Sequence, residues 1–225
     1  MQARVDHLVI GAASLDEGLA WCEATLGVTP QPGGEHPLMG THNRLLRIAT
    51  VDYPRAYLEV IAVQPGREPQ GRRRWFDLDD EAVRDALRRQ GPRLLHFVAA
   101  VPDVRAAVAS LQALDMDRGE VVRASRPTPR GLLQWQITIR PDGKRLFDGT
   151  LPTLIEWGEA HPAPALPESR VTLRGLGASH PQAPSLRQAC EAIGLQGFDI
   201  KEGAPRLCAM FDTPRGRVRL DSQGL

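Results

Sequence analysis

Two histidines lie inside apolar, β-branched stretches that are typical of buried strands. They are His7 in VDHLVI and His96 in LLHFVAAV. Two glutamates are placed in the same way, Glu59 in AYLEVIAV and Glu156 in PTLIEWGE. A carboxylate in such a run is costly to bury unless it is ion-paired, hydrogen-bonded or bound to a cation. Two imidazoles and two carboxylates together would suit one divalent transition metal, such as Zn, Ni, Mn, Fe or Co.

Strand geometry decides whether these four side chains can meet. Successive side chains of a strand point to opposite faces of the sheet. If the flanking leucines face the helices, His7 and Glu59 share the other face, and the same alternation puts His96 and Glu156 together. Each residue also has an ordinary interpretation, as a hydrogen-bonded histidine or as a solvent-facing or salt-bridged glutamate. The recurrence of both residue types at equivalent places favours the metal site.

The elements that would position these residues occur twice. HLVIGAASLDEGLAWCEATL, which begins at His7, aligns without a gap with HFVAAVPDVRAAVASLQALD, which begins at His96. Each copy starts as an apolar strand and continues as an amphipathic helix. Ser14 and Glu17 form a capping box for the first helix, and Asp103 can cap the second. Strand patterns follow both helices, so each copy predicts a βαβββ unit.

The sequence therefore predicts an α+β fold, in which tandem βαβββ modules form a cup-shaped mixed sheet and a shorter βαββ(β) unit follows. The first module covers residues 1–63 and the second covers residues 92–160. Residues 64–91 are expected to be a linker with a polar helix. Residues 170–225 are expected to be a partial third module, because ACEAIG echoes WCEATLG of the first helix.

Composition narrows the class of protein. The 225 residues are 42% hydrophobic, enough for a sizeable core, and 28 basic residues nearly balance 27 acidic ones. That balance gives no general attraction to nucleic acid or membrane lipid, and the run GRRRW (71–75) predicts a solvated surface. Three cysteines without a CxxC pair favour a reducing compartment, and neither a signal pattern nor a membrane-length apolar run occurs. We therefore expect a cytoplasmic protein whose partner is a small molecule, with no nucleic acid and no membrane.

The order His, Glu, His, Glu over two βαβββ units resembles the vicinal oxygen chelate superfamily, whose best-known member is glyoxalase I. More narrowly, GGEHPLMGTHNRLL (33–46) and LPTLIEWGEAHP (151–162) resemble the glyoxalase-like domain family, of the glyoxalase, bleomycin resistance and dioxygenase type. The resemblance covers about residues 1–165. It implies an eight-stranded, cup-like sheet that holds one divalent metal, which acts as a Lewis acid toward two neighbouring oxygens of a substrate.

By position, the resemblance implies that His7, Glu59, His96 and Glu156 are the metal ligands. It also implies that one glutamate, Glu156 in preference to Glu59, is the catalytic base that moves a proton on the carbon next to a carbonyl. That role requires burial to raise the pKa of the carboxyl toward the working pH. Glyoxalase I builds its site across a dimer, whereas both modules here lie in one chain, so a monomer could close the site and a homodimer is an open alternative.

Further polar residues lie between the first helix and the strand that follows it, in GGEHPLMGTHNRLL. His36, His42 and Asn43 would reach the rim of the cup and bind a polar substrate, or would serve a turn that satisfies its own backbone. Trp135 lies in a predicted strand of the second module, where it would line the cup as a substrate-binding residue or belong to the core.

Three functions fit these residues. The first is a metal-dependent isomerase, lyase or epimerase that acts through an enolate-like intermediate on a small metabolite with vicinal oxygens, of the α-hydroxy or α-keto type. The second is an iron(II) dioxygenase, in which His7, His96 and Glu156 form a two-histidine, one-carboxylate triad. The third is a metal-free resistance protein that binds a small toxic ligand. Metal content and oxygen dependence would separate the three.

Overall fold

The computed structural model describes residues 2–128 and 131–222, so the ends of the predicted modules at residues 1 and 223–225 lie outside the described residues. The first module contains β1 (Arg4–Gly11), α1 (Leu15–Leu26), β2 (Gln31–His36), β3 (Thr41–Arg47) and β4 (Tyr57–Val63). After α2 (Glu81–Gln90), the second contains β5 (Arg93–Ala100), α3 (Val104–Gln112), β6 (Glu120–Thr128), β7 (Gly131–Ile139) and β8 (Thr153–Trp157). The C-terminal unit contains β9 (Thr172–Ser179), α4 (Ala183–Ala192), β10 (Asp199–Lys201), β11 (Arg206–Thr213) and β12 (Gly216–Asp221). Short 3-10 turns occur at Phe147–Gly149 and Ala163–Ala165.

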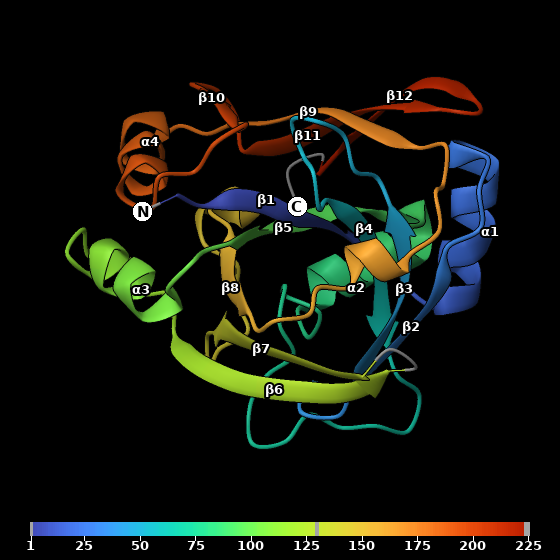
Figure 1. Cartoon of the computed structure of the whole chain (residues 1–225), viewed down its shortest axis with the longest axis horizontal. Coiled ribbons are helices and arrows are strands. Elements are labelled where there is room, and N and C mark those ends of the chain that lie inside the picture. The colour runs from blue at the N-terminus through green and yellow to red at the C-terminus, as the bar shows by residue number, and fades with distance from the viewer. Residues whose placement is uncertain (1, 129–130, 223–225) are drawn as a thin grey trace.

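The strands of the described residues form two sheets (Figure 1). The larger has eight strands in the order β2-β3-β4-β1-β5-β8-β7-β6, and the smaller has four in the order β10-β9-β11-β12. In the larger sheet, β1 pairs in parallel with β4, β5 pairs in parallel with β8, and the two halves join where β1 and β5 run antiparallel. The predicted α+β fold, with two βαβββ modules in a cup-shaped mixed sheet, is confirmed.

Local signals explain where the helices begin and end. The side chain of Ser14 accepts a hydrogen bond from the backbone N–H of Glu17, and Asp103 accepts one from Ala106, so both predicted N-caps are present. Gly27 ends α1 with φ at 74°, a left-handed conformation that glycine adopts without steric cost. These residues thus set where α1 begins and ends and where α3 begins.

The eight-stranded sheet curls until its two edge strands, β2 and β6, approach each other. The guanidinium of Arg126 on β6 lies against Gly34 on β2, where a Cβ would come within 1.8 Å of an Arg126 nitrogen. Figure 1 shows the two strands converging below the central strands. A side chain at position 34 would displace Arg126, so the glycine lets the cup close at this point.

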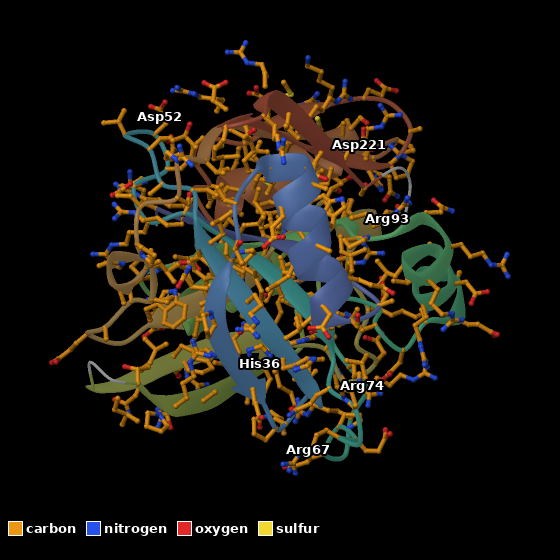
Figure 2. All side chains as sticks on the ribbon, turned by 90° about the vertical axis from the view of Figure 1, so that its right-hand side faces the viewer. His36, Asp52, Arg67, Arg74, Arg93 and Asp221 are labelled. Atoms are coloured by element: carbon orange, nitrogen blue, oxygen red, sulfur yellow. The ribbon has the colours of Figure 1, made fainter. Side chains whose placement is uncertain are left out.

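The segment between the modules folds into the cup, although its GRRRW run predicted a solvated surface. Phe76 and Leu78 are buried against the concave face, in one apolar cluster with Val9 and Val98. Arg74 is 7% exposed and pairs with Asp79 through atoms 2.7 Å apart. Figure 2 shows Arg74 near Arg67 in this loop. The backbone carbonyl of Arg67 accepts a hydrogen bond from the guanidinium of Arg74. The prediction was wrong for Arg74, because its pairing with Asp79 lets the guanidinium be buried, whereas Arg73 of the same run is exposed as predicted.

The C-terminal unit covers the convex face of the large sheet. Leu8, Leu58 and Phe97 pack there in one cluster with Leu173 and Phe211 of the small sheet. The element order of this unit repeats that of the modules, but its pairing differs, because β9 lies between β10 and β11. Among the described residues, no helix is long and apolar enough to span a bilayer.

Candidate active site

A cavity of about 40 Å³ remains in the cup beside the buried linker. Its polar lining comes from His7, His36, Asn43 and Glu59, with Arg126 at the junction of the edge strands. The aromatic rings that line it are those of Tyr57, Trp75, Phe76, Trp135 and Trp157. The cavity therefore combines a few polar groups with an apolar wall, which is typical of a small-molecule site.

Asp6 holds the ring of His7 in one orientation. Nδ1 of His7 lies 2.6 Å from Oδ1 of Asp6, which is 1% exposed. The pairing of β1 with β5 shifts register between Val5 and His7, and this bulge lets two successive side chains meet. A carboxylate can only accept, so Nδ1 of His7 is the donor, and Nε2 on the other side of the ring faces the cavity.

Two more rings donate to Asp6. Nε1 of Trp157 and Nε2 of His161 each lie 2.9 Å from its Oδ2. Burial alone would raise the pKa of Asp6, but the hydrogen bonds from His161 and His7 outweigh it and hold the pKa well below its usual range. Asp6 is therefore a carboxylate with a full set of donors.

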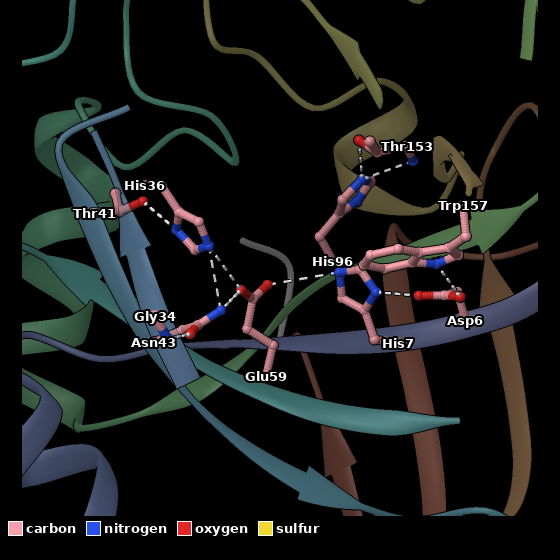
Figure 3. Close-up of polar contacts among 10 residues, drawn as sticks. All are labelled: Asp6, His7, Gly34, His36, Thr41, Asn43, Glu59, His96, Thr153 and Trp157. Carbon is pink, nitrogen blue, oxygen red and sulfur yellow. Dashed lines mark hydrogen bonds and ion pairs between the residues drawn. The ribbon is translucent and has the colours of Figure 1, made fainter. Parts of the chain in front are cut away.

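Glu59 reaches the other nitrogen of His7. Its Oε2 lies 3.6 Å from Nε2 of His7, and its Oε1 accepts a hydrogen bond from Nδ2 of Asn43 (Figure 3). The amide of Asn43 is oriented in turn, because its Oδ1 accepts the backbone N–H of Gly34 at 2.7 Å. Asp6, His7, Glu59 and Asn43 thus form a continuous polar row across three strands.

Of the predicted substrate-binding residues, His36, Asn43 and Trp135 line the cavity. Nδ1 of His36 lies 3.0 Å from Oγ1 of Thr41, and burial lowers the pKa of His36 to about 4, so its ring is neutral at neutral pH. His42 alternates with the inward-facing residues of β3 and lies on the other face, away from the cavity.

His96 shares the concave face but has no free lone pair. Its Nε2 accepts the backbone N–H of Thr153 at 3.1 Å, and its Nδ1 lies 2.9 Å from the carbonyl oxygen of Gly149. Because a backbone N–H can only donate, the proton of the neutral ring is on Nδ1. Burial lowers the pKa of His96 well below its usual value, and the charge of nearby Arg118 lowers it further. Both ring nitrogens of His96 are therefore hydrogen-bonded to the backbone of the protein itself.

Glu156 does not join His96, which corrects the expectation from strand alternation. Its Oε2 accepts the backbone N–H of Val104 at 2.8 Å, and its Oε1 accepts from the side chain of Gln136. Val104 is the first residue of α3, and the first amides of a helix have no partner within it. A carboxylate there also complements the positive end of the helix, so Glu156 stabilises α3 on the outer face of the sheet.

The strand register explains why Glu156 is not the counterpart of Glu59. Val9, two residues after the first histidine, pairs with Glu59. Val98, two residues after the second histidine, pairs with Thr153. The equivalent position is thus Thr153, and Glu156 lies three residues farther along, on the opposite face.

The four predicted ligands do not converge around one point. His7 and Glu59 meet, His96 is occupied, and Glu156 faces outward. In the part of the chain that the structure describes, no group of three or more His, Cys, Asp and Glu side chains is arranged to hold a metal ion. The residues present do not fit a metal site of the glyoxalase I type. They also do not fit the iron(II) triad of His7, His96 and Glu156. A metal held by His7 and Glu59 with other ligands stays a prediction.

Several residues of the site carry no prediction from the sequence. Asp6 had a local signal, as a second ionisable residue in the strand of His7. His161, Trp157 and Trp75 had none, because they come from segments far from β1 in the sequence, Trp75 and Trp157 to the cavity and His161 to Asp6.

Comparisons with known proteins found one family profile and several solved structures that are similar to this chain. The profile of the glyoxalase-like domain family matches residues 5–194. A hypothetical protein from Staphylococcus aureus has a similar structure, with a TM-score of 0.58 and 15% identity over 97% of this chain and 85% of that one. Methylmalonyl-CoA epimerase from Streptomyces coelicolor gives a TM-score of 0.43 and 18% identity over 72% of this chain and 100% of the other. Methylmalonyl-CoA epimerase from Mycobacterium tuberculosis gives a TM-score of 0.39 and 18% identity over 72% of this chain and 91% of the other.

No curated protein sequence matches the chain significantly. The profile match extends over most of the chain, and the half-barrel sheet of eight strands is that of the vicinal oxygen chelate superfamily. The chain belongs to the glyoxalase-like domain family of that superfamily.

Proposed function

We propose that the protein is an enzyme of the isomerase or lyase type that moves a proton on a small oxygenated metabolite, of the α-hydroxy or α-keto type. One observation carries the proposal. Asp6 orients His7 so that Nε2 faces Glu59 inside a cavity with aromatic walls. A partly buried imidazole held by a carboxylate is a common arrangement for a general base.

In this proposal, His7 takes the proton from the carbon next to the carbonyl and returns it to a neighbouring atom of the same substrate. Asp6 stays ionised, accepts the hydrogen bond from Nδ1 of His7 and stabilises the imidazolium that forms. Glu59, held by Asn43, accepts a hydrogen bond from a substrate hydroxyl and so orients the carbon toward Nε2. The guanidinium of Arg126 supplies positive charge for the oxygen on which the negative charge develops.

The size of the cavity supports a small substrate. Its volume of about 40 Å³ holds roughly three water-sized groups. The cytoplasmic location, a possible homodimer and the identity of the metabolite stay predictions.

Solvent exchange tests the proposal on any substrate of this class, whatever product forms from it. The enzyme is incubated in D₂O with a panel of α-hydroxy ketones, α-hydroxy acids and α-keto acids, and proton NMR follows replacement of the C–H next to the carbonyl by deuterium. We expect exchange on at least one compound. His7→Gln should slow it by about 10²- to 10⁴-fold, the usual contribution of a general base.

The variant Glu35→Gln is the matched control for Glu59→Gln, because Glu35 is exposed on the edge strand β2. Exchange should fall in Glu59→Gln and stay at the wild-type rate in Glu35→Gln. Folded His7→Gln protein that exchanges at the wild-type rate would contradict the proposal. Binding of a compound without any exchange would favour the metal-free binding protein instead.

Elemental analysis tests the metal prediction separately. The structure leaves no free lone pair on His96, so His96→Ala should not change the content of any divalent metal that co-purifies. About one metal per chain, lost in both His7→Ala and His96→Ala, would show that the four-ligand site forms after all.

A further inference from the structure

A second cavity lies beside the first, with Trp75 and Phe76 lining both. It has a volume of about 10 Å³, which is about enough for one oxygen-sized atom. Four cationic side chains line it, those of Arg118, Arg140, Lys144 and Arg145, and no aspartate or glutamate does.

Arg118 is the innermost of these cations. It is 2% exposed, and its Nη2 donates to Oγ1 of Thr153 at 2.7 Å. Its Nε and Nη1 are buried and have no hydrogen-bond partner among the described residues. Burial, together with the charge of Arg140, lowers the pKa of Arg118 to about 9, although Asp117 acts in the opposite direction. A buried guanidinium with two unused donors is costly unless a ligand completes it.

The neighbouring arginines have partners of their own. Arg145 pairs with Asp77 at 2.7 Å, and Arg140 pairs with Asp142 at 2.8 Å. In the described part of the chain, neither Arg118 nor Lys144 forms an ion pair within 4 Å. Lys144 is exposed, so the positive charge extends from the buried guanidinium to solvent. The cavity thus carries an excess positive charge along one line.

We propose that this cavity binds a small oxyanion, a carboxylate or a phosphate group, with one oxygen accepting from Nη1 or Nε of Arg118 and the rest directed toward Lys144. Nε and Nη1 lie on different sides of the guanidinium, so each offers a separate charge-assisted donor to an oxygen. The site goes beyond the proton transfer proposed above, because none of its anion-binding residues takes part in that step. The oxyanion comes either from a free ion or from the acid group of a larger molecule that reaches in from solvent.

Thermal melting against anion concentration tests the site. Sodium phosphate and sodium acetate are titrated at constant ionic strength into the wild type, Arg118→Met and Arg105→Met. Arg105 is an exposed arginine on α3 and serves as the matched control. The melting temperature of the wild type and of Arg105→Met should rise and saturate with the anion. In Arg118→Met the dissociation constant should increase by about tenfold or more.

The variants are compared by how steeply the melting temperature rises with anion concentration, and not by the melting temperature itself. Removal of a buried charge can change stability in either direction. If Arg118→Met does not fold, Arg118→Lys keeps the charge without the guanidinium donors and should bind both anions more weakly. Equal slopes in the wild type and the Arg118 variant, or no saturable response in the wild type, would overturn the proposal. Tighter binding of pyruvate and 2-oxobutyrate than of acetate would assign the oxyanion to a larger molecule, and equal binding would assign it to a free ion.

Discussion

Asp6 shows how one buried carboxylate organises the neighbouring residues. It is 1% exposed and accepts hydrogen bonds from His7, Trp157 and His161. Those donors come from β1, from β8 and from the segment after β8, so a single acceptor ties the first strand to the end of the second module. Removal of any donor would leave part of a buried charge unpaired, which costs more than the loss of an ordinary hydrogen bond.

The buried histidines predict how stability depends on pH. Burial lowers the pKa of His36 from 6.5 to about 4 and also lowers that of His96. Between about pH 6.5 and pH 4 the unfolded chain therefore binds more protons than the folded one, so the free energy of unfolding should fall as pH falls through this window. His36 alone would contribute up to roughly 3 kcal/mol, fully present above the window. Asp6 affects the pH dependence of stability only below this window. Its pKa is lowered from 3.8, so its contribution to stability is lost as the pH falls below about 3.8.

Urea denaturation across this pH range provides the measurement. His36→Asn should reduce the slope of unfolding free energy against pH. Ile48→Val, a non-titrating change in the core, should lower stability by about 0.5 to 1.5 kcal/mol at every pH and keep the slope. An unchanged slope in His36→Asn would show that His36 binds its proton as readily in the folded protein as in the unfolded chain, which contradicts the lowered pKa.

The segment before α2, which contains Phe76 and Leu78, fills part of the cup. Phe76 and Asp77 both have φ at 59°, a left-handed conformation that is unfavourable for residues with a Cβ. Arg145 holds Asp77 at 2.7 Å, and Leu78 is 1% exposed in the cluster on the concave face. Apolar burial and one ion pair thus keep the segment inside the cup, where it separates the two cavities.

Leu78→Ala should therefore lower the free energy of unfolding by about 2 to 5 kcal/mol, the usual cost of a large-to-small change in a packed core. Val51→Ala is the control, because Val51 is 94% exposed and should change stability by no more than about 0.5 kcal/mol. Chemical denaturation measures both. Equal stabilities for the two variants would mean that the segment is not packed in the cup in solution.

At the scale of the whole molecule, the small sheet and the cup share one core. Phe211 and Leu173 of the C-terminal unit pack in the same cluster as Leu8 and Leu58 of the central strands. We therefore expect the cup and the C-terminal unit to unfold together in a single cooperative transition.

The cysteines and tryptophans allow this expectation to be measured. Trp75, Trp135 and Trp157 report on the cup, and Cys190 reports on the C-terminal unit. Burial raises the pKa of the Cys190 thiol to about 12, so it should react with a thiol reagent only after unfolding. In a Cys22→Ala, Cys208→Ser background, Cys190 labelling and tryptophan fluorescence should have the same denaturant midpoint. Labelling at a clearly lower midpoint would show that the C-terminal unit opens by itself.

The sequence by itself determined the elements and which face most of their side chains take. The two βαβββ repeats, the caps at Ser14 and Asp103, and the common face of His7 and Glu59 follow from local periodicity, because the spacing of apolar residues specifies a helix or a strand. These features depend on residues close together in the chain, so the order of the residues is enough to predict them.

Only the tertiary structure decided which of those residues meet. The register of β5 with β8 makes Thr153, not Glu156, the counterpart of Glu59, and a bulge in β1 brings Asp6 to His7. Packing of a loop onto the concave face brings Trp75 to the cavity. Strand register, bulges and loop packing depend on contacts between segments far apart in the chain, which local periodicity does not encode.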